Sequence, residues 1–377
     1  MRKADLVVVG ASFAGLVCAR TAAMRGLDVV VIEAKQSPSA RIHTTGILVK
    51  EADEEIDTPP AVARAIHKVR LYAPSLKSID LAAPGYYFLT TDTAALIAWL
   101  AGETRRAGAE FLCGRKLTVA KPDESLIVLP EFNLSCRFLV GADGARSTVA
   151  GLFGLARNTR FLTGLEVEYE DLPGADHGCL HCFLDSKLAR GYLAWVAPAP
   201  GFFQAGLATS DGHKPDLKAF LAKTESLFGF SGARVKERRS GLIPCGGPIH
   251  PFSGNNVMLI GDAAGHVSPM TGGGIRLAFR FGRRAGQLIA DHLTRNGPAP
   301  GPVLAKELPG FGSKLVMRSL IEWGPPNWLY NLAIGTPVMR EIARRIYFHR
   351  RAAPGDSFAE FDKYTRGAGD HGKTENL

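Results

Sequence analysis

The sequence predicts an α/β fold, in which a Rossmann-like nucleotide-binding domain is interrupted by a mainly antiparallel β-sheet domain and followed by a helical C-terminal region. Three observations support this prediction. Residues 5–33 carry a β-α-β pattern, residues 165–240 change to short strands separated by loops, and residues 256–260 return to the pattern of a buried strand. With 377 residues, of which 46% are hydrophobic, the chain can bury more than one core.

The first β-α-β unit begins with an apolar, β-branched run at residues 5–10. Residues 14–25 have helix-forming composition and stop at Gly26, and residues 27–33 repeat the strand pattern. Two parallel strands joined by a helix need about this length. The unit is therefore expected to open a parallel sheet through a right-handed crossover.

The turn after the first strand is a G-x-G-x-x-G fingerprint with serine at the middle glycine, reading Gly10-Ala11-Ser12-Phe13-Ala14-Gly15. Gly10 permits the tight turn, Gly15 lets helix and strand pack closely, and the helix N-terminus directs free amides at a pyrophosphate. Glu33, at the end of the second strand, is placed to accept hydrogen bonds from ribose hydroxyls. These residues predict a dinucleotide site.

The elements expected further along are helices at residues 93–107, 216–228 and 275–294, strands at 109–113, 116–120, 191–196, 202–208 and 256–260, a hairpin formed by 125–129 and 132–140, and a linker or turn at 297–302.

Two later motifs indicate that the dinucleotide is a flavin. An Asp-Gly pair lies in the turn at residues 141–147, after an apolar strand, and taken alone it can equally be an ordinary turn. Asp262 follows another buried strand, where its carboxylate can accept hydrogen bonds from ribityl hydroxyls. The glycine-rich run at residues 271–275 precedes a helix, so its amides and the helix dipole can face the edge of an isoalloxazine that becomes negative on reduction.

Taken in order, these motifs resemble those of the FAD-dependent oxidoreductases with the p-hydroxybenzoate hydroxylase fold, over most of residues 4–295: GASFAG at 10–15, Glu33, GADGARS at 141–147 and GDAAGHVSPMTGGGI at 261–275. Within them, residues 241–248 followed by 255–265 are similar to the geranylgeranyl reductase family. The aromatic hydroxylases usually carry histidine directly after GDAA, whereas here Gly265 precedes His266. The resemblance implies hydride transfer from reduced FAD to a C=C bond of an isoprenoid or other hydrophobic substrate.

The resemblance also implies which residues bind. Val119 would offer backbone groups to adenine, and Arg41 would help to hold the adenosine-ribityl part, although it can equally be a solvated loop residue. The expected FAD-binding residues are Gly10, Ala11, Ser12, Phe13, Ala14, Gly15, Glu33, Ala34, Arg41, Val119, Asp143, Gly144, Gly261, Asp262, Gly272, Gly273, Gly274 and Ile275. The expected substrate-binding residues are Tyr192, Trp195 and Pro269.

The chain departs from the family pattern in three places. Tyr192 stands three residues before Trp195 rather than two, and Ala197 replaces an aromatic residue of the substrate-side signature. Residues 41–46 replace a Cys-Gly step, and an arginine common near Thr93 is missing. The substrate pocket is therefore expected to differ from that of the family.

Three side chains are candidates for proton transfer or redox chemistry. His43 and His266 are expected near the isoalloxazine, where histidine can donate a proton near neutral pH, and Cys245 precedes the flavin motif. For each of them a packing role is the alternative. The pair Cys179 and Cys182 stands alone and points to opposite faces of a strand, so no metal site is predicted.

The expected division of the chain assigns residues 1–75, 92–160 and 246–296 to the FAD-binding domain, 76–91 and 161–245 to the substrate domain, 303–365 to a helical C-terminal cap and 366–377 to a disordered tail.

Charge is concentrated near the C-terminus. Residues 276–351 contain 13 Lys or Arg against 4 Asp or Glu, which accounts for the formal net charge of +9. With its aromatic residues, this segment is either a solvated face or a peripheral contact with anionic lipid, and no motif indicates nucleic acid. Scattered cysteines and the lack of a signal-peptide pattern predict a cytoplasmic protein, with this contact at the inner face of the membrane.

Two other functions remain open. A flavin monooxygenase would use the same FAD site with NAD(P)H and O₂, and a non-catalytic electron-transfer protein would bind flavin without turning over a substrate. No second dinucleotide fingerprint is visible, so the electron donor is either transiently bound NAD(P)H or a ferredoxin-like protein.

Overall fold

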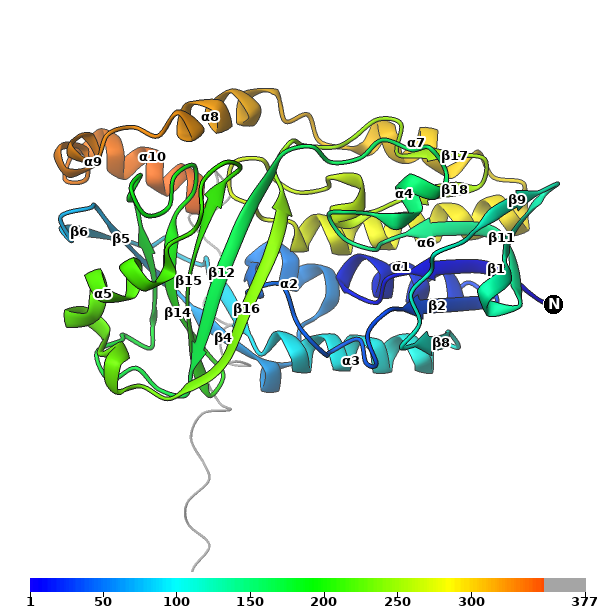
Figure 1. Cartoon of the computed structure of the whole chain (residues 1–377), viewed down its shortest axis with the longest axis horizontal. Coiled ribbons are helices and arrows are strands. Elements are labelled where there is room, and N and C mark those ends of the chain that lie inside the picture. Colours follow the sequence, from blue (N-terminus) through cyan, green and yellow to red (C-terminus); the bar gives the residue numbers. More distant parts are fainter. Residues whose placement is uncertain (349–377) are drawn as a thin grey trace, which may run out of the picture.

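The computed structural model describes residues 1–348 and contains two parts that lie side by side, with three helices laid across the second (Figure 1). The predicted disordered tail at 366–377 and the end of the predicted cap lie outside the described residues. Within residues 1–348, no helix has the length and apolar character needed to cross a membrane.

The first part is built on a sheet whose central strands are parallel, in the order β17-β18-β11-β1-β2-β8. Leu6, Val7 and Val8 of β1 are completely buried, as expected for a strand covered on both faces. The strands are β1 (Arg2–Val9), β2 (Val29–Glu33), β8 (Glu110–Cys113), β11 (Leu134–Gly141), β18 (Val257–Leu259) and the short antiparallel β17 (Ser253–Gly254), and β9 (Lys121–Asp123) and β10 (Leu126–Leu129) extend the sheet from β11.

Three helices cover this sheet: α1 (Phe13–Ala23), α3 (Thr93–Arg106) and α6 (Ile275–Arg295). Helix α6 packs closely on α1 because two glycines of α6 face α1. A Cβ atom on Gly282 would lie 2.6 Å from the Ala14 carbonyl oxygen, and one on Gly286 would lie 2.6 Å from that of Cys18. The packing of α6, from late in the chain, thus fixes the position of the first helix.

The second part is a seven-stranded sheet in which β13 and β5 form the one parallel pair. Its strands, in spatial order, are β16 (Val235–Pro244), β12 (Phe161–Tyr169), β15 (Phe202–Ser210), β14 (Ala194–Ala199), β13 (Cys179–Phe183), β5 (Lys68–Tyr72) and β6 (Ser78–Leu81). Helix α5 (Leu217–Phe228) covers one face with Phe220 and Phe228. A small third sheet, β3 (Ile47–Val49), β7 (Phe88–Thr91) and β4 (Ala63–Ile66), lies with α2 (Lys50–Ile56) near the junction of the two parts.

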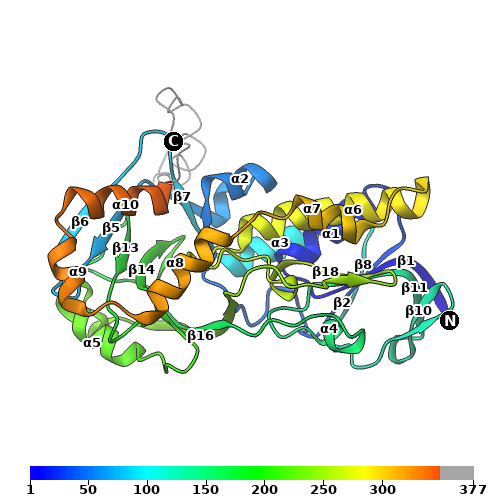
Figure 2. The same ribbon diagram turned by 90° about the horizontal axis from the view of Figure 1, so that it is seen from above.

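The C-terminal helices lie across the other face of the seven-stranded sheet, where Ile334, Ala343 and Phe348 pack against Leu71 and Leu180 (Figure 2). These helices are α8 (Gly312–Trp323), α9 (Asn327–Ala333) and α10 (Pro337–Phe348), whereas α7 (Pro300–Glu307) packs on α6 in the first part.

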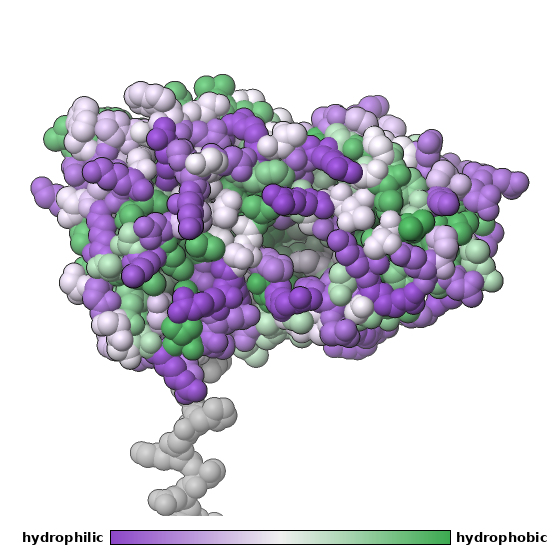
Figure 3. All heavy atoms as spheres, in the orientation of Figure 1, coloured by the Kyte–Doolittle hydropathy of each residue, from purple (hydrophilic) through white to green (hydrophobic). Residues whose placement is uncertain are grey.

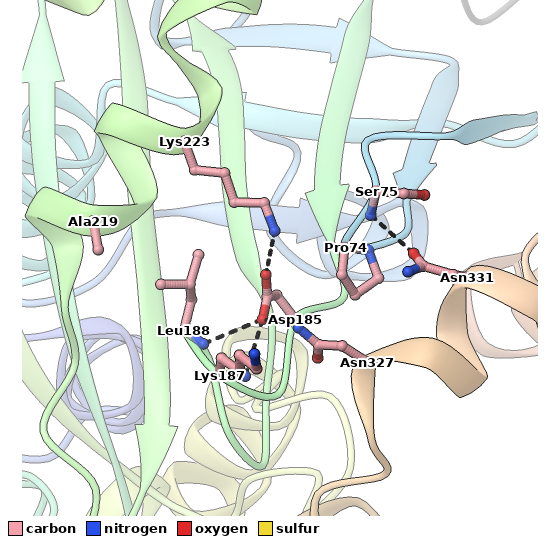
Figure 4. Close-up of a pocket in the computed structure, with 9 residues that line it drawn as sticks. All are labelled: Pro74, Ser75, Asp185, Lys187, Leu188, Ala219, Lys223, Asn327 and Asn331. Atoms are coloured by element: carbon pink, nitrogen blue, oxygen red, sulfur yellow. Dashed lines mark hydrogen bonds and ion pairs between the residues drawn. The ribbon is translucent and has the colours of Figure 1, made fainter.

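Helix α9 is anchored at a shallow pocket of about 370 Å³, drawn in Figure 4. Asp185 accepts hydrogen bonds from Lys223 Nζ at 2.5 Å and Asn327 Nδ2 at 2.8 Å, and the Ser75 amide donates to Asn331 Oδ1 at 2.8 Å. These polar groups bond to one another, and none of them belongs to the predicted FAD-binding set. We therefore interpret the pocket as a structural contact between helix α9 and the second part.

Two local predictions were wrong. Residues 116–120 form no strand, because the Glu131 carboxylate accepts the amides of Thr118 and Val119 in place of a neighbouring strand. The expected linker at 297–302 becomes helical from Pro300, since proline is well tolerated in the first turn of a helix.

Candidate functional site

The site begins where two turns meet at the carboxyl ends of β1 and β11. Gly10 has a φ of 103°, and a Cβ atom there would lie 2.3 Å from the Ala142 carbonyl oxygen. A Cβ atom on Gly15 would lie 2.0 Å from the carbonyl oxygen of Gly10. Any side chain would force the turns apart, so both glycines are required for this packing.

The first turn of α1 and the Glu33 carboxylate lie at the same edge. Ser12 is the N-cap of α1 but its hydroxyl makes no capping hydrogen bond, which leaves the first-turn amides without a side-chain partner. Glu33 is 6% exposed, and its Oε2 accepts the Ala11 amide at 2.8 Å while Oε1 accepts that of Lys35 at 2.9 Å. A ribose bound to Glu33 would thus lie beside amides suited to a pyrophosphate.

Asp143 has a local structural role in the turn after β11. Its carboxylate accepts hydrogen bonds from the Ser147 hydroxyl at 2.6 Å and from the amides of Thr148 and Val149 at 2.6 and 3.0 Å. These bonds begin helix α4 (Thr148–Leu152). Gly144, with a φ of 85°, completes the turn.

The carboxylate of Asp262 is a hydrogen-bond acceptor that receives no donor from the described residues. It lies half-buried in a 3-10 helix, Gly261–Ala264, and within residues 1–348 no hydrogen bond to its carboxylate is found. Burial raises the pKa of this carboxyl to about 6. A Cβ atom on Gly274 would lie 3.4 Å from Asp262 Oδ1, so the carboxylate and the glycine run before α6 share one edge. A ligand hydroxyl would relieve the desolvated carboxylate.

Tyr192 connects the second sheet to this edge. It precedes β14, and its hydroxyl donates to the Thr271 carbonyl oxygen in the glycine run. A Cβ atom on Gly272 would lie 2.9 Å from the same hydroxyl. The aromatic residue predicted to face substrate is therefore in contact with the loop predicted to face the flavin. Figure 3 shows that the surface is hollowed where the two parts meet.

An apolar wall continues from Tyr192 along the sheet. Trp195 covers Gly206, where a Cβ atom would lie 2.6 Å from the indole ring, and it packs in one cluster with Leu162 and Cys245. Burial raises the pKa of the Cys245 thiol, which keeps it protonated at neutral pH. Pro269 is also buried, beside Gly247.

The two candidate histidines have different surroundings. His43 is exposed, and its Nδ1 lies 2.9 Å from the Ser240 carbonyl oxygen on β16. His266 is 1% exposed and packs between the rings of Phe252 and Phe281, at 5.9 and 5.0 Å. Burial lowers the pKa of His266 to about 3, so this imidazole is neutral at pH 7. Its environment corresponds to the packing alternative.

Two expected cofactor residues are exposed. Arg41 adopts a left-handed conformation with a φ of 47° in the loop after β2. Val119 is 36% exposed, and its amide donates to Glu131 Oε2 at 3.2 Å. The adenine contact predicted for the Val119 backbone therefore competes with Glu131 for this amide.

The cysteines of the C-x-x-C pair lie buried in β13, where burial raises the pKa of the Cys182 thiol to about 12. Among residues 1–348 no group of three or more His, Cys, Asp or Glu side chains is placed to hold a metal ion.

The sequence reasoning missed a buried polar cluster on the same face as Trp195. Glu166 Oε2 accepts the Trp195 indole N–H at 3.0 Å, and Glu168 pairs with Arg239 at 2.7 Å. Gln204 joins the cluster to the loop after His43 by donating to the Thr45 carbonyl oxygen at 2.8 Å. Burial raises the pKa of Glu166 to about 7. The available signal was the alternation of two glutamates with apolar residues at 165–169, which places both glutamates on one face of a strand.

Comparison with known proteins bears on this geometry. A family model described as FAD dependent oxidoreductase matches residues 5–120, and one described as FAD binding domain matches residues 128–300. Digeranylgeranylglycerophospholipid reductase 2 of Methanopyrus kandleri is 26% identical over 307 residues, 76% of this chain and 77% of the relative. Menaquinone reductase of Mycolicibacterium smegmatis is 28% identical over 374 residues, 91% of each chain.

The chain is an FAD-dependent oxidoreductase, and it is similar to reductases of geranylgeranyl lipids and of menaquinone. Its fold agrees: a geranylgeranyl bacteriochlorophyll reductase-like protein from Thermoplasma acidophilum superposes with a TM-score of 0.80 at 20% identity, over 97% of this chain and 100% of that one.

FAD fits the site of this flavoprotein on observations of its own residues. Among residues 1–348 the carboxylate of Asp262 has no donor, the first turn of α1 has no side-chain cap, and the packing of Gly10 and Gly15 leaves the backbone bare at the strand ends. Each feature matches a different portion of the dinucleotide: ribityl hydroxyls, pyrophosphate and the close approach of the backbone.

Proposed function

We propose that this flavoprotein transfers a hydride from reduced FAD to a carbon–carbon double bond of an isoprenoid or other hydrophobic substrate. The observation that carries the proposal is the contact of Tyr192 with Thr271, which sets the apolar wall of Trp195 and Cys245 against the glycine run. The relatives named as reductases of geranylgeranyl lipids and of menaquinone support the same reaction class.

We assign each part of the FAD molecule to residues that are described above. The residues from Gly10 to Gly15 hold the pyrophosphate, Glu33 with Ala34 and Arg41 holds the adenosine side, and Val119 faces adenine. Asp143 and Gly144 shape the neighbouring turn. Asp262 and Gly261 hold the ribityl chain, and the segment from Gly272 to Ile275 faces the pyrimidine edge of the flavin.

Bound FAD supplies the hydride. The protein positions the double bond, excludes water and donates the one proton that the reaction needs. Tyr192, Trp195 and Pro269 orient the substrate, and the α6 dipole stabilises negative charge near Gly274. Glu166, whose pKa is about 7, retains a proton on its carboxyl group at neutral pH better than an exposed glutamate does. His43 is the alternative donor, and the neutral His266 and the thiol of Cys245 contribute packing.

The test is single turnover of the dithionite-reduced holoprotein under anaerobic conditions, with menaquinone and a geranylgeranyl lipid as alternative acceptors. The expected result is flavin reoxidation with a product that has gained two hydrogen atoms in its isoprenoid chain, measured after any hydroquinone has been reoxidised to the quinone. Oxygen-dependent turnover that gives a hydroxylated product would instead establish the monooxygenase alternative. Reduced flavin that no acceptor reoxidises would leave only electron transfer. NAD(P)H and a reduced ferredoxin can then be compared as electron donors.

The C-terminal helices support a peripheral membrane contact at the inner face of the cytoplasmic membrane. Nine large apolar side chains on α8, α9 and α10 are 39% to 71% exposed, and we call them the cap patch: Val316, Met317, Leu320, Trp323, Trp328, Leu329, Leu332, Val338 and Ile342. The exposed Arg340, Arg344 and Arg345 lie on the same helices. Apolar side chains flanked by cations favour an anionic lipid surface.

Vesicle cosedimentation tests the cap patch. We expect the holoprotein to sediment with phosphatidylglycerol vesicles more than with phosphatidylcholine vesicles, and W323S/L332S to lose most of this binding. M24S is the matched control, because Met24 is 69% exposed on another part of the molecule. Equal sedimentation of wild type and W323S/L332S would show that the cap patch faces water.

A further inference from the structure

Arg318 on α8 is a buried cation with unused donors. Its side chain is completely buried, and its Nε donates to Glu322 Oε1 at 2.8 Å. Both terminal nitrogens, Nη1 and Nη2, are buried and have no hydrogen-bond partner among residues 1–348. Buried guanidinium nitrogens that remain unbonded are costly, so a partner beyond the described residues is expected.

The surrounding charges do not neutralise Arg318. Glu322 also accepts Arg160 Nη2, so one carboxylate serves two guanidinium groups. A third arginine, Arg190, uses its side chain on the carbonyl oxygens of Glu322 and Trp323 at the end of α8. The cluster therefore keeps a positive charge, which favours an anion at the unbonded Nη1 and Nη2 of Arg318.

The position of Arg318 relates it to the substrate wall. A Cβ atom on Gly191 would lie 3.1 Å from Arg318 Nη2, and Gly191 directly precedes Tyr192. One turn earlier on α8, Leu315 lies against Gly247 beside Pro269. Helix α8 thus extends from the flavin loop to Arg318. The guanidinium group of Arg318 lies near the backbone at Tyr192, whereas the Tyr192 hydroxyl at the other end of the side chain contacts Thr271.

We propose that Arg318 binds the phosphate group of the substrate and thereby holds its isoprenoid chain against Tyr192 and Trp195. A guanidinium donates two parallel hydrogen bonds to phosphate oxygens, and Nη1 and Nη2 are the donors that remain available. The proposal rests on the proposed function, because it assigns the polar end of the same lipid substrate. The phosphate can belong to a lipid head group or be a free ion.

Two substrates that differ only in the phosphate group separate its contribution from that of the isoprenoid chain. The reduced holoprotein is given geranylgeranyl phosphate or geranylgeraniol, and kcat/KM is compared between them. The wild type is expected to prefer the phosphate, and R318Q to lose about 10- to 100-fold of that preference, as for the loss of a charged hydrogen-bonded pair. R295Q is the matched control, since Arg295 also forms an i,i+4 ion pair but is exposed on α6. An unchanged preference in R318Q overturns the proposal, as does an equal loss on both substrates.

A binding measurement separates this proposal from the proposed function. The melting temperature of the oxidised holoprotein is measured with octyl phosphate below its micelle concentration, with octanol and with inorganic phosphate. Stabilisation of the wild type by octyl phosphate alone, absent in R318Q and weakened in R318K, supports a lipid phosphate site even if no double bond is reduced. Equal stabilisation by inorganic phosphate assigns the site to the free ion, and no stabilisation by either phosphate overturns the proposal.

Discussion

Asp262 illustrates how a single residue can report on the cofactor. Its half-buried carboxylate has a raised pKa and no donor from residues 1–348, so FAD is expected to supply the hydrogen bonds that it lacks. D262A should weaken FAD binding about 10- to 100-fold. The flavin absorbance per protein after gel filtration measures this, with D123A, a change of an exposed residue on β9, as control. Full flavin occupancy in D262A would refute the assignment.

Glu166 predicts a pH dependence of stability. Because burial raises its pKa from the usual 4.5 to about 7, the folded protein binds this proton more tightly than the unfolded chain does. This contribution is fully present below about pH 4.5 and is lost as the pH rises through 7, to a total of roughly 3 kcal/mol. E166Q should therefore lose less stability than the wild type between pH 5 and pH 8.

Urea unfolding of the apoprotein at these two pH values measures the difference. E170Q is the control, because Glu170 is an exposed carboxylate directly after the same strand, paired with Arg234. If E166Q and wild type change in parallel with pH, another group carries the proton.

At the level of elements, the packing of α6 on α1 depends on two glycines, Gly282 and Gly286, which have no side chain. G282A would place a Cβ atom 2.6 Å from the backbone of Ala14, in the helix proposed to bind pyrophosphate. We expect a loss of about 1–3 kcal/mol in unfolding free energy, as for other overpacked sites, together with weaker FAD binding.

The control for G282A is G102A on α3, where the nearest atom to a new Cβ is the flexible end of Arg106 at 3.5 Å. Alanine there should raise stability by about 0.5–1 kcal/mol, since it is the better helix former. Chemical unfolding of both variants distinguishes close packing from helix propensity. Equal effects of the two substitutions would contradict the packing argument.

Local elements with strong patterns were predictable from the sequence. The bounds of the first β-α-β unit are confirmed to within three residues, and those of the helices at 93–107 and 275–294 to within one, because burial on both faces and helix periodicity leave a clear pattern. The run at 116–120 resembled a strand, but a distant carboxylate, Glu131, decided its conformation. Propensity cannot anticipate a partner of this kind.

The site shows the same limit at the scale of the whole molecule. Its glycines and Asp262 could be proposed from the sequence because each has a local chemical reason. The contact between Tyr192 and Thr271 and the burial of Arg318 were not, since both depend on how β14 and α8 are placed by the rest of the fold. For the same reason Glu166 was overlooked, as only the assembled sheet places it beside Trp195.

The late position of α6 in the chain has a consequence for biosynthesis. Strand β18 and helix α6, residues 257–295, complete a layer whose first strand begins at residue 2. While the ribosome makes the intervening residues, the face of α1 that α6 covers stays exposed to solvent, as does the edge of β11 that β18 later covers. This nascent species is the one most prone to aggregate or to engage chaperones. A chain terminated before residue 275 is accordingly expected to be degraded without ever acquiring flavin.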